Sequence, residues 1–402
     1  MSYPLSRIQQ RIPLLRELPI EVTALSLIAF FVALGFGIVA PVIPMFASEF
    51  GVSALAASSV ISVFAFTRLI AAPPAGALVN RIGERRVLSW GLIIVSVSSA
   101  LAGLSQNFTQ LLILRGLGGF GSTMFTVAAM ALLIRIVPAE LRGRAASAWS
   151  GGFLIGGLAG PAVGGIFVAL SLRSPFFIYA ITLLAASAVS WKHLSKAHLL
   201  ENANESTESA LKISTALRSP AYLSALGTNF NVGLVRFGVL NALIPLMVIQ
   251  LLDLSPAVAS IAFLVSSISQ ASLLVYAGRL TDSHGRRISM ILGNSFTVVG
   301  LTVLAFTQSP LVLILAMILM GLAGSFLASA PTAVVGDVTH GKKSGRVVST
   351  YQMAADFGAI FGPLIAGFLL DSSGSFSVPF ALAAGFTLIF VVMSFRMPET
   401  KR

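Results

Sequence analysis

Four ionisable side chains lie inside long apolar runs of this sequence: Arg68, Arg115, Arg236 and Asp356. A charge at membrane depth is costly, so such residues usually belong to a proton path, an ion path or a substrate site. Three guanidinium groups and one carboxylate can hold an anionic group, or shift the pKa of the acid through their charge. We therefore take these four residues as the candidate chemistry of the chain.

The apolar runs that must position these charges are long. Of the 402 residues, 56% are hydrophobic and only 10% are charged, against about 25% charged in a typical soluble protein. A helix needs about 20 apolar residues to cross the hydrocarbon core of a bilayer. Twelve segments qualify, near residues 23–45, 54–76, 87–106, 110–134, 146–170, 175–191, 221–250, 256–278, 288–307, 310–335, 347–370 and 377–396. We expect an all-α protein with 12 transmembrane helices in a lipid bilayer.

Basic residues indicate the orientation of these helices. Of the 26 Lys and Arg residues, all but Arg173 and the three intramembrane arginines lie at the termini or in every second loop. Loops rich in Lys and Arg stay in the cytoplasm. The pattern predicts a multi-pass plasma (inner) membrane protein with both termini cytoplasmic. The net charge of +12 then reflects topology, and we expect no nucleic-acid partner.

The sequence repeats itself at an offset of 202 residues. Glycines recur every four residues from Gly152 to Gly164, and a matching pattern follows at Gly358–Gly367. Such a small-residue stripe lets another backbone approach closely, and Pro161 and Pro363 add a bend at one point. We interpret the stripes as paired close-packing helices at the boundary between two halves. The predicted division is residues 1–191, a cytoplasmic linker at 192–219 that is plain or holds a short amphipathic helix, and residues 220–402.

Three motifs carry a family resemblance. A Gly-x-Leu-x-Asp-type loop occurs twice, with Asn80 replacing the acid in the first copy; its key positions are Gly76, Asn80, Gly83 and Arg85, then Gly278, Asp282, Gly285 and Arg286. Arg115 precedes a glycine cluster. The stripe contains Gly156, Gly160, Pro161 and Gly164, and its copy contains Gly362 and Pro363. On these motifs the chain resembles the major facilitator superfamily over essentially its whole length.

The resemblance implies two pseudo-symmetric six-helix halves that work by alternating access. It associates the Arg115 motif with proton coupling and the Gly156–Gly164 motif with drug–proton antiporters. Energy would come from a proton gradient, with no cofactor, and we expect a monomer that binds protons and a small-molecule substrate. Many proton-coupled relatives carry an acid in the first or fourth helix, and this chain has none there.

The intramembrane charges then receive candidate roles. Counting 1.5 Å per residue, Arg68 and Asp356 both lie roughly 12–14 Å from the cytoplasmic face. In the resembled fold, helices two and eleven are neighbours, so we hypothesise an Arg68–Asp356 ion pair that gates transport; a static pair that fixes helix register is the alternative. Arg115 either controls the charge of the acid or of an anionic substrate, or extends to the outer interface.

Arg236 lies near the middle of the seventh segment. With Asn229, Asn231 and Asn241 it forms a polar sector that we interpret as substrate-binding; a cluster of hydrogen bonds between helices is the alternative. Three interior cations against one acid favour neutral or acidic amphiphiles as substrates.

The leading hypothesis is a proton-coupled secondary exporter of small amphiphilic compounds or drugs. The first alternative is an uptake carrier for an organic anion or sugar, and the second is a receptor or scaffold that transports nothing. We do not expect an enzyme or a metal site: the chain has no cysteine, and we find no nucleophile–base pair, metal-ligand cluster or phosphate loop in it.

Overall fold

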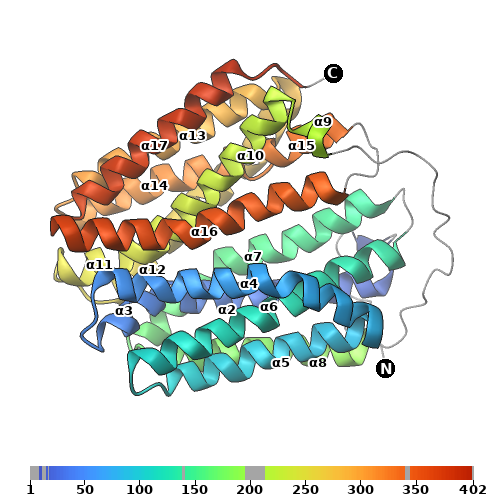
Figure 1. The fold of residues 1–402 in the computed structure, drawn as a ribbon, viewed down its shortest axis with the longest axis horizontal. Helices are drawn as coiled ribbons and strands as arrows, with labels where there is room; N and C mark the ends of the chain where they lie inside the picture. Colours follow the sequence, from blue (N-terminus) through green and yellow to red (C-terminus); the bar gives the residue numbers. More distant parts are fainter. Residues whose placement is uncertain are drawn as a thin grey trace. The chain divides into compact units, whose positions relative to one another are not determined.

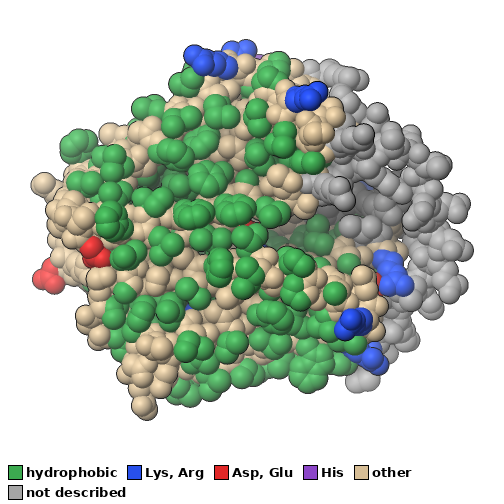
Figure 2. All heavy atoms as spheres, in the orientation of Figure 1, with side chains coloured by type: hydrophobic (Ala, Val, Ile, Leu, Met, Phe, Trp, Pro, Cys, Tyr) green, Lys and Arg blue, Asp and Glu red, His purple; other side chains and the backbone are tan. Residues whose placement is uncertain are grey.

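All secondary structure in the computed structural model is helical among the residues it describes, which are 9–10, 15–16, 18–137, 141–194, 213–339 and 345–400. Twelve of the helical segments are long and apolar enough to cross a membrane, from Ile20–Ser48 to Ser377–Arg396. This confirms the predicted all-α membrane fold. Large apolar side chains such as Phe306 (76% exposed) lie on the surface, and Figure 2 shows hydrophobic side chains across much of the visible face.

The chain forms two compact units. Unit 1 consists of residues 1–42 and 66–205, and unit 2 of residues 43–65 and 206–402. The sequence-based halves differ from these units at residues 43–65, which pack in unit 2 although they precede most of the first half. Most of the expected linker lies outside the described residues, and its described part includes the short helix α9 (Ile213–Ala216).

Among its described residues, unit 1 contains five complete long helices and the second part of α4 (Figure 1). These are α2 (Ile20–Val39), α4 (Ala54–Ile82), α5 (Glu84–Gly103), α6 (Phe108–Ile136), α7 (Arg142–Val168) and α8 (Ser174–His193), and the short 3₁₀ turn η2 (Ala40–Val42) follows α2. Helix α2 packs on α7 and α8, and α5 packs on α6 and α8.

Unit 2 has the same pairing pattern. Its helices are α3 (Ile43–Ser48), α10 (Pro220–Val232), the π-helix η4 (Gly233–Leu240), α11 (Asn241–Gln250), α12 (Ala257–Ser283), α13 (Arg286–Ala305), α14 (Pro310–Leu327), α15 (Ala330–Thr339), α16 (Gly345–Ser373) and α17 (Ser377–Arg396). Helix α16 packs on α10 and η4, and α13 packs on α14 and α17. These contacts repeat those of α7 and α5 in unit 1.

The two glycine stripes pack inside the units. A Cβ atom built on Gly160 would lie 2.6 Å from the Cα of Gly37 on α2, and one on Gly362 would lie 3.0 Å from the Cα of Gly238 on η4. Only glycine allows backbones this close. Most of each stripe therefore joins the first and fifth spans of its own repeat. At the end of the second stripe, Gly367 packs on Leu55 of α4, which belongs to the first half of the sequence, so this end lies where the sequence predicts a boundary between the halves.

Candidate functional site

The buried cation of unit 1 is Arg115 on α6. Its side chain is 2% exposed, and it interacts electrostatically with the buried Tyr179 of α8. A side chain this deep in the unit does not reach an interface by extension, which disfavours the alternative that Arg115 only extends to the membrane surface. Tyr179 was missed by the sequence interpretation, because a tyrosine in an apolar run carries no motif.

Arg68 lies on α4 and is held by α6. Its Nη1 donates a hydrogen bond to Ser122 Oγ (2.8 Å), and its main-chain oxygen accepts one from Thr123 Oγ1 (2.8 Å). Asp356 is a partly buried residue of α16 in unit 2. The proposed Arg68–Asp356 pair joins residues of different units, so it stays a prediction.

Arg236 lies in the π-helix η4 and contacts Gln270 of α12. Its Nη2 donates to Gln270 Oε1 at 2.5 Å, while Gln270 Nε2 donates to the main-chain oxygen of Gly324 on α14 (3.4 Å). A Cβ on Gly324 would lie 2.5 Å from Arg236 Nη1, so the end of the guanidinium packs directly against this glycine. Among the described residues Arg236 forms no ion pair. A partly buried cation thus has an amide as its partner, held by three helices.

The three predicted asparagines divide into different surroundings. Asn229 Nδ2 donates to the main-chain oxygen of Tyr351 on α16 (2.7 Å), and the buried Asn231 accepts from Thr387 Oγ1 on α17 (3.1 Å). Asn241 Nδ2 donates to the oxygen of Phe237 one turn earlier (3.4 Å). The first two therefore tie helices together, as the alternative interpretation expected, and their substrate role stays a prediction.

The π-helix is a feature that the sequence interpretation missed. It places Gly233 so close to α16 that a Cβ there would overlap the main-chain oxygen of Ala355. π-Helical turns are rare and occur frequently at functional sites. In unit 1 the corresponding span instead has the 3₁₀ turn η2, with Pro41 as its middle residue. The signals that the sequence offered were two glycines, Gly233 and Gly238, within this otherwise mostly apolar run.

The loop motifs form structured corners. Gly83 and Gly285 both have positive φ (85° and 107°), and each precedes a helix start, which explains why glycine recurs there.

The arginines of the two motifs hold neighbouring helices. Arg85 Nη2 donates to the main-chain oxygen of Trp191 (2.6 Å), and the Arg85 guanidinium lies 4.9 Å from the centroid of the Trp191 ring. In unit 2, Arg286 bonds Asp337 (3.1 Å) and Asp282 (3.4 Å). Gly76, Asn80 and Gly278 lie in the last turns of α4 and α12.

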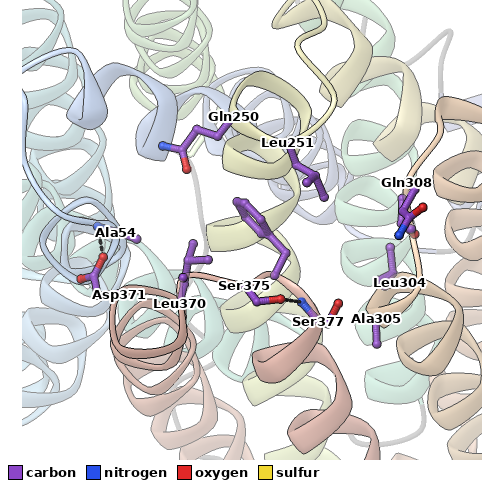
Figure 3. A pocket seen from close by; sticks show the side chains of 13 residues that line it. Ala54, Gln250, Leu251, Leu304, Ala305, Gln308, Leu370, Asp371, Ser375 and Ser377 are labelled. Carbon is purple, nitrogen blue, oxygen red and sulfur yellow. Dashed lines mark hydrogen bonds between the residues drawn. The ribbon is translucent and has the colours of Figure 1, made fainter.

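A cavity of about 620 Å³ opens in unit 2 at the ends of α4, α11 and α16. Its walls mix amides such as Gln250 and Gln308 with apolar groups such as Leu370. Figure 3 shows the Asp371 carboxylate at one side of this cavity, directed toward Ala54.

Comparison with known proteins gives a family match along almost the whole chain. The model of the Major Facilitator Superfamily matches residues 25–239 and 225–402. A multidrug resistance protein, MdtG of Klebsiella pneumoniae (strain 342), is 30% identical in an alignment of 388 positions that covers 92% of each chain.

Two solved structures have a similar fold. A bacterial homolog of the human lysosomal transporter Spinster, in an inward-facing and occupied conformation, matches with a TM-score of 0.73 and 14% identity over 93% of this chain and 95% of that one. The nucleoside transporter NupG matches with a TM-score of 0.71 and 12% identity, over 93% and 98%.

Proposed function

Because this chain belongs to the Major Facilitator Superfamily, whose members are transporters rather than enzymes, we propose that it is a proton-coupled exporter of small amphiphilic compounds. The observation that carries the proposal is its similarity to a multidrug resistance protein at 30% identity over 92% of both chains. Export would proceed by alternating access, in which the substrate site opens to one side of the membrane at a time. The proton gradient would supply the energy.

Proton coupling requires a group that changes its charge during the cycle. Asp356 is the one carboxylate that the sequence places well inside an apolar span, on α16. Its charge would be balanced by a guanidinium in one state and lost by protonation in another, with Arg68 and Arg115 as the candidate guanidinium groups. An exporter driven in this way would stop working when Asp356 cannot release a proton.

The surroundings of Arg236 support neutral or acidic amphiphiles as the substrate class. A cation in a membrane span is costly unless it is paired, and Arg236 has only the uncharged Gln270 as its hydrogen-bond partner among the described residues. Gln270 fixes one side of the guanidinium plane and leaves its other N–H groups free to donate. A planar guanidinium recognises a carboxylate or a similar anion through two parallel hydrogen bonds.

The coupling is tested by transport in proteoliposomes with an imposed pH gradient. Substrate-dependent proton movement should occur in the native protein and disappear in the Asp356→Asn variant. Asp253→Asn, a change of another acid in a loop of unit 2, should leave transport unchanged. A substrate flux that does not change with the pH gradient would contradict proton coupling. Net substrate uptake driven by inward proton flow would indicate an importer. Partner binding without any flux would indicate a receptor or scaffold.

The substrate class is tested with a panel of lipophilic acids, neutral compounds and cations. In Arg236→Gln the export of acids should fall by about tenfold or more, because a hydrogen bond to a charged group is lost, while export of neutral compounds should fall less. Arg236→Lys keeps the charge but loses the planar fork, so its effect should be intermediate. Strong export of dications, with no effect of Arg236→Gln on acids, would overturn this assignment.

A further inference from the structure

The Ala54 end of α4 is held by a carboxylate that lies far away in the sequence. The main-chain amide of Ala54 donates to Asp371 Oδ1 (2.9 Å; Figure 3), and that of Leu55 donates to Oδ2 (2.8 Å). The first amides of a helix have no partner within it. Asp371 therefore supplies both bonds with one charged group, which also interacts favourably with the positive end of the helix dipole.

Two more contacts join α4 and α16 farther toward the membrane interior. Together with the Asp371 contact they form a line of contacts that we call the α4–α16 seam. A Cβ on Gly367 would lie 2.7 Å from the Cα of Leu55, so the helices touch through their backbones there. Ser62 Oγ then donates to the main-chain oxygen of Ile360 (2.7 Å). Positions 360, 367 and 371 lie on one face of α16 because they are separated by seven and four residues. The seam thus runs along α16 for about three turns.

The seam belongs entirely to unit 2, although its two helices come from different repeats of the sequence. The repeat offset of 202 places Ala169 at the position that matches Asp371. The helix that corresponds to α4 in the second repeat, α12, begins at Ala257, whose main-chain amide donates to the hydroxyl of Ser255 (3.4 Å) rather than to a carboxylate. The fold therefore does not require an acid at the position of Asp371. The presence of a carboxylate there suggests a role beyond holding the fold.

We propose that Asp371 is a latch that holds the Ala54 end of α4 against α16 and is released when these helix ends separate during transport. This role rests on the alternating-access part of the proposed function, since only a cycle of opening and closing needs a contact that breaks. The position suits a reversible contact. Asp371 is exposed and borders the 620 Å³ cavity, so water can take over the hydrogen bonds of the carboxylate and of the two amides when they part.

The absence of cysteine from the chain allows a direct test. Val52→Cys and Ser372→Cys place one spin label on each side of the seam, and pulsed electron resonance measures the distribution of distances between them. In the protein with native Asp371, most molecules should show the short distance between the two spin labels, because the helix ends are held together. In Asp371→Ala the ratio of long to short distances should rise by about fivefold, as expected for loss of a helix cap, and Asp371→Asn should give a smaller rise because one acceptor oxygen remains.

The matched control is Asp253→Asn, which removes a second carboxylate from unit 2 without touching the amides of α4. It should leave the distances unchanged. An unchanged distribution in folded Asp371→Ala would overturn the latch, as would an equal rise in the Asp253 control. Because distances are measured without substrate or pH gradient, this result is independent of whether the proposed substrate or proton coupling is right.

Discussion

Glu84 and Arg135 form an ion pair in unit 1 (2.7 Å), and the positions 202 residues later form the same pair with the charges exchanged. There Arg286 bonds Asp337 at 3.1 Å. In each unit the pair connects the start of the third span to the end of the fourth, next to a glycine with positive φ. The two repeats have kept the contact while reversing its polarity, which indicates that the joining of these helix ends matters more than the sign of either charge.

This symmetry predicts that the pair in unit 1 tolerates exchange. Glu84→Arg alone should lower the free energy of unfolding by about 1 kcal/mol, because Arg135 is 44% exposed and its interaction is screened by solvent. The double variant Glu84→Arg with Arg135→Asp, which copies the arrangement of unit 2, should recover most of that loss. Thermal unfolding in detergent measures both effects. Additive losses in the double variant would show that the two side chains do not act as a pair.

The close glycine contacts predict a position-dependent effect of alanine. Gly160→Ala would place a Cβ 2.6 Å from Gly37, and the overlap should lower the free energy of unfolding by about 1–3 kcal/mol. Gly362→Ala, against Gly238 in unit 2, should behave similarly. Gly157 is the matched control on the same helix, because nothing lies within 4 Å of its Cβ position; Gly157→Ala should be neutral or slightly stabilising. Equal effects at 157 and 160 would contradict the stripe as a packing surface.

The sequence predicted the spans well because membrane length and apolar composition are local properties. The segment expected at 146–170, for example, appears as Ser147–Val168, and that expected at 175–191 as Ser174–His193. It also placed Arg115 and Arg236 inside spans. The sequence did not predict the π-helix at 233–240. This helix depends on the close packing of α16 against Gly233, which is a contact between residues far apart in the sequence.

The sequence could not predict which side chains form hydrogen bonds with one another between helices. Gln270 lies 34 residues from Arg236, and Asp371 lies 316 residues from Leu55. No periodicity links such positions, since only the packing of separate helices brings them together. An amide inside an apolar run, as at Gln270, was the one available signal, because a polar group in a membrane usually has a hydrogen-bond partner on another helix.

The Arg68–Asp356 hypothesis predicts that each charge depends on the other. Arg68→Ala or Asp356→Ala alone would leave a partly buried charge without its proposed partner and should abolish transport. The exchange variant, Arg68→Asp with Asp356→Arg, should regain measurable substrate flux if the two side chains pair during the cycle. Failed transport in the exchange variant, together with a cysteine cross-link between α4 and α16 that substrate does not change, would exclude a gating pair.

A carboxylate near the C-terminus, that of Glu399, caps another helix, and its removal should have a measurable effect. Glu399 accepts from the main-chain amides of Arg286 (2.9 Å, Oε1) and Arg287 (3.1 Å, Oε2), so one carboxylate satisfies the first turn of α13 just as Asp371 does for α4. Glu399→Ala should therefore speed hydrogen exchange at these two amides and lower the free energy of unfolding by about 1 kcal/mol. Hydrogen-exchange mass spectrometry of the 285–290 region measures the first effect. Glu49→Ala, which removes an exposed carboxylate elsewhere, should leave exchange there unchanged; if both variants gave the same exchange, the tail would not be capping α13.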